Sequence, residues 1–156
     1  MLNVDIPGFG ELEIENLVLD INGTISLKGE MIPGVADRLN LLARDLTIYA
    51  ITADTRGNAS KLIRGLDIRL HRIEHHNEDI QKRDFIRNIG RKNTVSVGNG
   101  YNDAFMLKES LIGICVIGGE GAALDSLLNA DVIVNDINDG LDLLLNLHSL
   151  IATLRR

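Results

Sequence analysis

The stretch LVLDINGTIS, residues 17–26, leads from an apolar run through an acid into a turn. Three apolar residues precede Asp20, and Ile-Asn-Gly-Thr follows it. The run predicts a buried strand, and the glycine-containing turn predicts the end of that strand. Asp20 is therefore expected at the mouth of a buried sheet. Two features need a physical reason: an acid at such a place, and Asn22 rather than a second acid two positions later.

Four further apolar runs alternate with stretches of helical periodicity. Together with Leu17–Asp20, the predicted strands are Leu46–Thr52, Thr94–Asn99, Leu111–Ile117 and Asp131–Asp136. Between these strands, apolar residues recur at the spacing of one helical face: Val35/Leu39/Leu42, Ala59/Leu62/Ile63 and Phe85/Ile86/Ile89. Continuous apolar strands suit a parallel sheet that is covered on both faces. The pattern predicts an α/β fold, a three-layer α/β/α sandwich with a mainly parallel, Rossmann-like sheet.

The chain length and the gaps between strands indicate a single domain. The chain has 156 residues, 45% of them hydrophobic, which suffices for a substantial core. Residues 1–16 predict a small hairpin turning at Pro7–Gly10, and residues 17–145 predict the core. Each gap has room for one helix, and Ser26–Gly34 for only a small flap. No cap domain is expected.

Residues 139–154 predict a C-terminal helix with an excess of leucine. The leucines cover more than one helical face: Leu141, Leu143, Leu144, Leu145, Leu147, Leu150 and Leu154. The surplus indicates either a contact with a second copy of the chain, giving a homo-oligomer, or a helix lying in a groove of its own subunit. Both alternatives stay open here.

Composition argues against several classes of partner. Sixteen basic and 22 acidic residues give a net charge of −6, and aromatic residues make up 3% of the chain with no Trp. These values disfavour a nucleic-acid surface. No apolar run approaches the ~20 residues that span a bilayer, and the N-terminus lacks a signal-peptide pattern. With Cys115 as a small core residue, we expect a cytoplasmic protein without membrane partners.

Polar residues follow the predicted strands where ligands bind to such sheets, at the carboxyl ends. They are Asp20, Asn22, Thr24, Thr52, Asp54, Asn99, Asn102 and Asp103, joined by Lys82 from a helix; Ala53 lies between Thr52 and Asp54. Phosphoryl transfer through an aspartate needs such a set: an ionised nucleophile, a divalent metal, and a cation and a hydroxyl to stabilise charge. Lys82 precedes Phe85, Ile86 and Ile89 by three, four and seven residues, on the buried stripe of a helix predicted over Glu78–Ile89. A buried cation needs a carboxylate partner, unless the side chain reaches solvent from the helix end.

Four motifs in this order resemble the haloacid dehalogenase (HAD) superfamily. They are DINGT (residues 20–24), TAD (52–54), Lys82 and GNGYND (98–103). The likeness is greatest to the phosphorylation domain of P-type ATPases, with its Asp-Lys-Thr-Gly-Thr, Thr-Gly-Asp, Lys and Gly-Asp-Gly-x-Asn-Asp. It runs from Leu17 to Leu145 and implies a Mg²⁺-dependent phosphatase that acts through an aspartyl phosphate on a small phosphorylated substrate or a phosphoprotein.

The resemblance implies a role for each matching residue. Asp20 would be phosphorylated, Thr52 would hold the phosphoryl group, Lys82 would bridge phosphate and Asp20, and Asp103 would support the lysine or the metal. The implied catalytic residues are Asp20, Asn22, Thr52 and Lys82. The implied Mg²⁺ residues are Asp20, Asn22 through its carbonyl, Asn99 and Asp103. The implied substrate-binding residues are Asn22, Gly23, Thr24, Thr52, Ala53, Lys82 and Asn102.

Two departures from the family pattern change the expected chemistry. Family phosphatases usually carry a second Asp, a general acid and base, where this chain has Asn22, which cannot exchange a proton. Asn22 therefore predicts slow hydrolysis of the aspartyl phosphate. Asn99 replaces a metal-binding Asp and predicts a weaker Mg²⁺ site, because one negative charge is lost.

The departures keep a second function class open, a catalytically weakened domain that binds phosphate or a protein partner. A phosphoacceptor of receiver type is disfavoured, because its acidic pair comes first and its lysine last. His71, His75 and His76 are expected in a solvated loop. Gly118–Gly121 predicts a strand-to-helix turn, since the Lys-Ser/Thr of a P-loop is absent.

Overall fold

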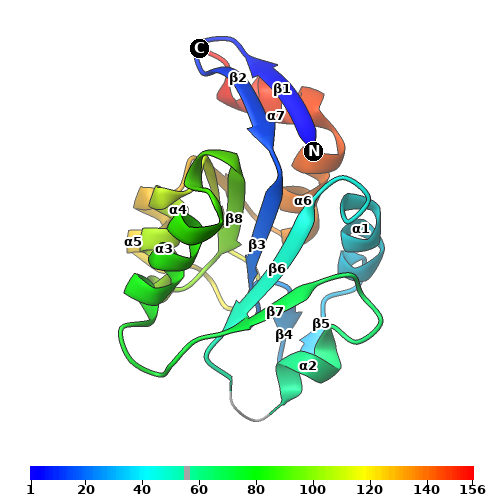
Figure 1. The fold of residues 1–156 in the computed structure, drawn as a ribbon, viewed down its shortest axis with the longest axis vertical. Coiled ribbons are helices and arrows are strands. Elements are labelled where there is room, and N and C mark those ends of the chain that lie inside the picture. The colour runs from blue at the N-terminus through cyan, green and yellow to red at the C-terminus, as the bar shows by residue number, and fades with distance from the viewer. Residues whose placement is uncertain (55–56) are drawn as a thin grey trace.

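A six-stranded sheet forms the centre of the computed structural model, which describes residues 1–54 and 57–156. Its order is β10-β9-β8-β3-β6-β7, and all neighbouring strands are parallel (Figure 1). The strands are β3 (Asn16–Asp20), β6 (Thr47–Thr52), β7 (Arg69–Arg72), β8 (Thr94–Gly98), β9 (Ile112–Val116) and β10 (Val132–Val134). The predicted α/β fold with a parallel sheet is confirmed.

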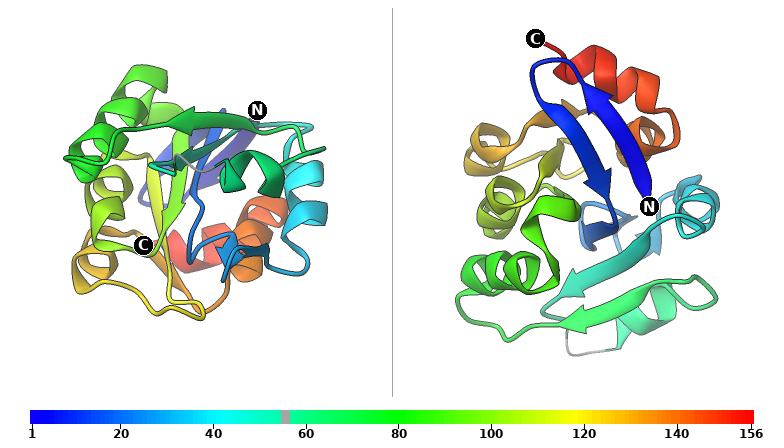
Figure 2. Two further views of the ribbon diagram at one scale, coloured as in Figure 1. Left: turned by 90° about the horizontal axis from the view of Figure 1, so that it is seen from below. Right: turned by 45° about the horizontal axis from the view of Figure 1, so that its top comes forward.

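Helices cover both faces of this sheet, as the two further views in Figure 2 show. On one face lie α3 (Glu78–Ile89), α4 (Ala104–Glu109) and α5 (Leu124–Asn129), and on the other lie α1 (Val35–Leu42) and α6 (Ile137–Leu145). Leu17 and Leu19 join the core on the α1 and α6 side, whereas Val18 packs with Phe85 and Ile86 of α3. Successive side chains of β3 are thus buried on opposite faces, which explains its uninterrupted apolar sequence.

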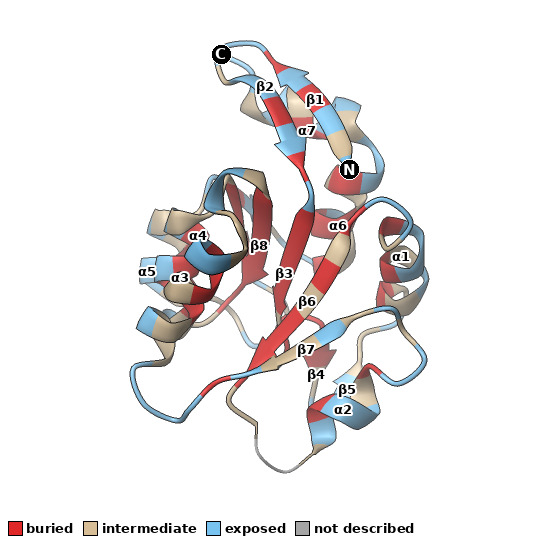
Figure 3. Cartoon of the chain, viewed as in Figure 1, coloured by how far each residue is buried: buried red, intermediate tan, exposed pale blue. Residues whose placement is uncertain are grey.

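Shorter elements frame the carboxyl ends of the strands. The predicted flap is a two-stranded ribbon of β4 (Ser26–Leu27) and β5 (Glu30–Met31), and the helix α2 (Asn58–Leu62) lies beyond β6. Two 3₁₀ turns, Arg91–Asn93 and Tyr101–Asp103, flank β8. Figure 3 shows the buried residues concentrated in the middle of the sheet. The strand β7 was not predicted, because its sequence RLHR is polar and the strand lies at the sheet edge, where it is partly exposed.

The single helix predicted over residues 139–154 is wrong. The chain forms α6 and then α7 (Leu147–Leu154), with a break at Asn146, whose φ of −127° and ψ of 85° are not helical. The break lets α7 turn onto the predicted N-terminal hairpin, formed by β1 (Leu2–Ile6) and β2 (Gly10–Ile14). Leu150 of α7 is completely buried in the same core as Ile6 and Ile14. Much of the leucine surplus is therefore used within the chain, and a contact with a second copy stays a prediction.

No helix among the described residues is long and apolar enough to cross a bilayer.

Replacing Leu150 by Ala should destabilise the protein, because it leaves a cavity between α7 and the hairpin. A fully buried leucine cut to alanine typically costs about 2–5 kcal/mol of unfolding free energy, and Leu150 has no exposed surface. Urea denaturation followed by circular dichroism measures the change. Leu128→Ala is the matched control, since Leu128 is 73% exposed. Equal midpoints for the two variants would contradict the packing of α7 on its own hairpin.

Candidate active site

The carboxyl ends of three adjacent strands bring the predicted residues to one edge of the sheet. Asp20 is the last residue of β3 and pairs in register with Ile51, one residue before Thr52 on β6. On the other side of β3, β8 ends at Gly98, directly before Asn99. A cleft of about 580 Å³ opens there. Eight of the residues predicted at the strand ends line it: Asp20, Asn22, Thr52, Ala53, Asp54, Lys82, Asn99 and Asn102.

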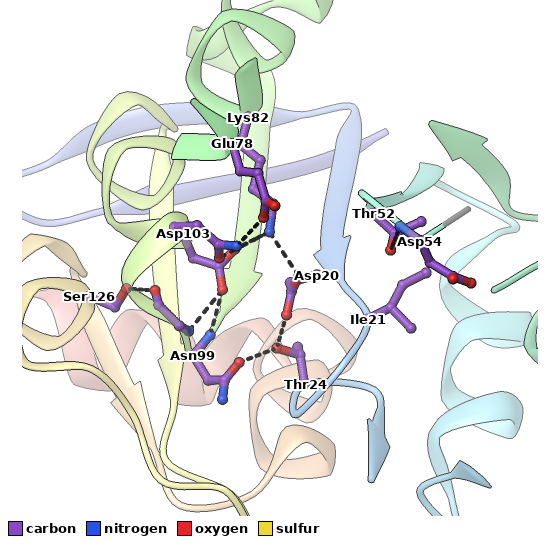
Figure 4. A network of polar contacts seen from close by, with 12 residues as sticks. Asp20, Ile21, Thr24, Thr52, Asp54, Glu78, Lys82, Asn99, Asp103 and Ser126 are labelled. Carbon is purple, nitrogen blue, oxygen red and sulfur yellow. Dashed lines mark hydrogen bonds and ion pairs between the residues drawn. The ribbon is translucent and has the colours of Figure 1, made fainter. Parts of the chain in front are cut away.

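Lys82 reaches this edge from α3 and contacts two carboxylates. Its side chain is 2% exposed, and its Nζ lies 2.9 Å from Asp20 Oδ1 and 2.7 Å from Asp103 Oδ1 (Figure 4). It also donates a hydrogen bond to Asn102 Oδ1 over 3.3 Å. The predicted burial of Lys82 and its pairing with rim carboxylates are confirmed, and the alternative of a solvent-exposed ammonium is wrong.

The electrostatics of this trio keep the lysine charged. Burial alone would lower the pKa of Lys82, but the Asp20 and Asp103 carboxylates outweigh it and raise the pKa above its ordinary value. For Asp103, burial and then the charge of Asp20 raise the pKa to about 6, although Lys82 and the Gly100 N–H oppose this. Lys82 is therefore a stable cation between the Asp20 and Asp103 side chains.

The side chain of Asp103 is fixed by hydrogen bonds from the backbone of the turn that follows β8. Its Oδ2 accepts hydrogen bonds from the backbone N–H groups of Asn99 (3.0 Å) and Gly100 (2.9 Å). A Cβ at Gly98 would lie 2.5 Å from Asp103 Cγ, so that only glycine fits there. Asp103 is completely buried, and both of its oxygens are engaged. These contacts favour support of Lys82 over metal binding, the two roles that the resemblance left open.

Thr24 connects the first motif to Asn99. Its hydroxyl lies 3.1 Å from Asp20 Oδ2 and 3.3 Å from Asn99 Oδ1, while Asn99 Nδ2 donates to the Gly121 carbonyl over 3.1 Å. The turn itself is closed by the Ile21 carbonyl, which accepts from three backbone N–H groups. Thr24 is completely buried and fixes the orientation of the Asp20 carboxylate.

Thr52 faces the cleft from the other side of Asp20, as Figure 4 shows. Its Oγ1 accepts a hydrogen bond from the Asp54 backbone N–H over 3.0 Å, and Asp54 Oδ2 accepts one from the Ala59 N–H over 3.1 Å. These two hydrogen bonds link Asp54 both to Thr52 and to the first turn of α2. They align the start of α2 with the end of β6.

Comparisons with known proteins identify relatives of this chain. No family model matches the chain. The chain is 41% identical over 92 residues to protein MJ0073 of Methanocaldococcus jannaschii. The matched segment makes up 56% of this chain and 99% of MJ0073. This chain belongs to the same family as MJ0073. It is 28% identical over 143 residues, 87% of its length, to a soluble P-type ATPase-like phosphatase of that organism. The chain spans only 51% of that phosphatase.

Solved structures identify the fold. A 3-deoxy-D-manno-octulosonate 8-phosphate phosphatase from Moraxella catarrhalis, in complex with magnesium, phosphate and KDO, superposes with a TM-score of 0.70 at 15% identity, over 91% of this chain and 94% of that one. A Legionella pneumophila structure assigned to the HAD superfamily, subfamily III A, gives 0.68 at 15% identity, over 90% and 87%. The chain has the HAD fold. The resemblance noted in the four motifs therefore holds at the level of the fold.

Not every residue predicted for the HAD site lines the cleft. Thr24 and Asp103 are completely buried behind Asp20 and Lys82, and Gly23 lies beside the cleft with a φ of +78°. Their contacts position other residues of the site. Whether any of the predicted residues binds substrate stays a prediction.

Two further residues of the site, Glu78 at the start of α3 and the nearby His75, were not predicted from the sequence. Glu78 lines the cleft and accepts a hydrogen bond from Asn102 Nδ2 over 2.6 Å, and His75 Nδ1 lies 3.7 Å from its other oxygen. Glu78 lies one helical turn before Lys82, which was the available signal. The expectation that His71 lies in a solvated loop is wrong: His71 is part of β7 and stacks on Phe85 with ring centroids 4.1 Å apart, and burial lowers its pKa.

The donor set fits a sparsely charged metal site. No group of three or more His, Cys, Asp or Glu side chains suited to a metal occurs in the described ranges 1–54 and 57–156. One carboxylate oxygen of Asp20 and the amide oxygen of Asn99 nevertheless lie within 3.3 Å of the same Thr24 hydroxyl. Oxygen donors of this kind suit Mg²⁺, and the single carboxylate predicts modest affinity.

Removing the Lys82 ammonium should destabilise the fold strongly. In Lys82→Met the carboxylates of Asp20 and Asp103 lose their shared cation, and breaking a buried pair typically costs about 3–5 kcal/mol. Urea unfolding measures the loss, with Lys108→Met as the exposed control on α4. Lys82→Met/Asp103→Asn should recover part of the loss, because one unpaired buried charge is gone. A Lys82→Met variant as stable as the control would contradict the ion-pair geometry.

Proposed function

We propose that this chain is a divalent-metal-dependent phosphatase that forms an aspartyl phosphate on Asp20. The observation that carries the proposal is the position of Asp20, at the floor of an open cleft with its Oδ1 2.9 Å from a buried lysine. Thr52 lies in the same cleft. The HAD fold and the 28% identity to a soluble P-type ATPase-like phosphatase support this assignment.

In the first step a carboxylate oxygen of Asp20 attacks the phosphorus of a phosphate monoester. The new Asp20–phosphorus bond forms as the bond from phosphorus to the ester oxygen breaks, and the alcohol leaves after taking a proton from water. Lys82 stabilises negative charge on the phosphoryl oxygens, and the Thr52 hydroxyl donates to one of them. When bound, Mg²⁺ would neutralise charge between Asp20 and the phosphate, held by Asp20, Asn99 and the Asn22 carbonyl.

In the second step water attacks the phosphorus of the aspartyl phosphate, which releases inorganic phosphate and restores the Asp20 carboxylate. Asn22 lines the cleft where an acid would assist both proton transfers. Its amide neither gives a proton to the leaving oxygen nor takes one from the attacking water. The loss of one acid–base group slows such steps by about 10²–10⁴-fold.

The substrate class follows from the open site. The described residues that line the cleft come from the ends of β3, β6 and β8, from the flap and α2, and from α3 and the loop before it; no separate cap domain is present in that part of the chain. We propose a small phosphorylated molecule or a phosphorylated side chain of a protein as substrate. No nucleic-acid or membrane partner is part of this proposal.

Asp20→Asn should abolish phosphatase activity, because the amide is not a nucleophile. Release of nitrophenol from p-nitrophenyl phosphate in the presence of Mg²⁺ measures the wild-type rate and its loss. Asp5→Asn, an exposed position on β1, is the matched control and should keep the wild-type rate. Equal rates for Asp20→Asn and wild type would exclude the proposed nucleophile.

Asn22→Asp should raise turnover by about 10²–10⁴-fold, because a general acid and base is restored. Acid quenching of the enzyme during turnover should reveal more aspartyl phosphate in wild type than in Asn22→Asp. An unchanged or lower rate in the variant would exclude slow hydrolysis as the consequence of Asn22.

Asn22 and Asn99 together favour a second candidate, a weakened domain that binds phosphate or a protein partner. Both amides stand at the rim where the family pattern has acids. Under this candidate, p-nitrophenyl phosphate is not cleaved, and neither an aspartyl phosphate nor a metal-fluoride complex is trapped. Slow release that disappears in Asp20→Asn distinguishes the enzyme from this binding domain.

A further inference from the structure

The loop between β9 and α5 is attached to the candidate metal site at two points. The Asn99 side chain donates to the Gly121 carbonyl over 3.1 Å, and the Ala123 N–H donates to the Asn99 carbonyl over 2.8 Å. A Cβ at Gly118 would lie 3.4 Å from the Gly23 carbonyl oxygen. The GGEG segment is thus a strand-to-helix connection, as predicted, but it also packs against the turn after Asp20.

Glu120 in this loop places a carboxylate at that turn. A Cβ at Gly23 would lie 2.4 Å from Glu120 Oε2 and 2.7 Å from Asn99 Nδ2, so both side chains occupy the space beside this glycine. Glu120 is exposed, and no other residue in the described ranges gives its carboxylate a hydrogen bond or an ion pair. An exposed carboxyl group without a hydrogen-bond or ion-pair partner among the described residues therefore lies beside the residues expected to hold the metal.

The charge of the site explains what this carboxylate can do. Lys82 forms ion pairs with both Asp103 and Asp20. With Asp103 assigned to the support of Lys82, Asp20 is the carboxylate that remains among the predicted metal residues, beside Asn22 and Asn99. Amide and backbone oxygens bind Mg²⁺ without adding negative charge. A second carboxylate close by would replace the charge that is missing at position 99.

We propose that Glu120 is a residue of the divalent-metal site and supplies the negative charge that Asn99 lacks. This inference rests on the proposed function, in which a divalent cation binds at Asp20 and Asn99. Glu120 acts on the cation directly or through a bound water, whereas Asn99 contributes its amide oxygen.

Direct measurement of metal binding tests this without an activity assay. Isothermal titration of the full chain with Mn²⁺, repeated with Mg²⁺, gives the affinity of wild type, Glu120→Gln, Asp20→Asn and Glu11→Gln. Glu11 is an exposed residue of the distant hairpin and controls for the loss of one surface charge. Loss of a residue that supports a metal site typically weakens binding by about 10–100-fold. We expect this range for Glu120→Gln and wild-type affinity for Glu11→Gln.

A compensating variant sharpens the test. Asn99→Asp/Glu120→Gln moves the acid back to position 99 and should bind Mn²⁺ more tightly than Glu120→Gln. Circular dichroism confirms that each variant is folded. Wild-type affinity in Glu120→Gln, together with weakened binding in Asp20→Asn, would overturn the role of Glu120 alone. Unchanged binding in Asp20→Asn, or no binding in wild type, would instead overturn the metal site of the proposed function.

Discussion

The ion pair of Lys82 with Asp20 and Asp103 is the constraint on which the rest of the site depends. A lysine that is 2% exposed must have its charge compensated within the protein. The two carboxylates come from the end of β3 and from the turn after β8, whereas the lysine comes from α3. The pair therefore requires α3 to pack across the ends of both strands, and it fixes the Asp20 side chain at the floor of the cleft.

The topology of the sheet explains why this constraint lies at β3. From β3 the chain builds β6 and β7 on one side and then returns to add β8, β9 and β10 on the other. Loops after β6 and β8 therefore diverge at the end of β3, which opens a crevice at that point. Asp20 stands in the crevice with Thr52 on one side and Asn99 on the other. The HAD fold thus creates the cleft, and the charged residues determine its chemistry.

Much of this was predictable from the sequence, because the decisive features are local. The apolar run before Asp20 predicts a strand end, and the spacing of Lys82 to Phe85, Ile86 and Ile89 predicts its burial. Other features depend on contacts between distant segments. The polar strand β7 is recognised only by its pairing with β6, and the break at Asn146 only by the hairpin onto which α7 turns. The closeness of Glu120 to Gly23 has no counterpart in the local sequence.

The amide of Asn99 has a structural role that an acid at this position could not fill. Asn99 Nδ2 donates to the Gly121 carbonyl, which a carboxylate at this position could not do. A carboxylate there would face both that carbonyl oxygen and the Glu120 carboxylate, whose Oε2 lies beside the same glycine as Asn99 Nδ2. Repulsion would then move the loop away from the turn after Asp20. An amide at position 99 and an acid at position 120 are thus compatible, whereas two acids are not. With Asn99 and Glu120, a carboxylate stays near Asp20, and the Asn99 amide holds the loop that carries Glu120 in place.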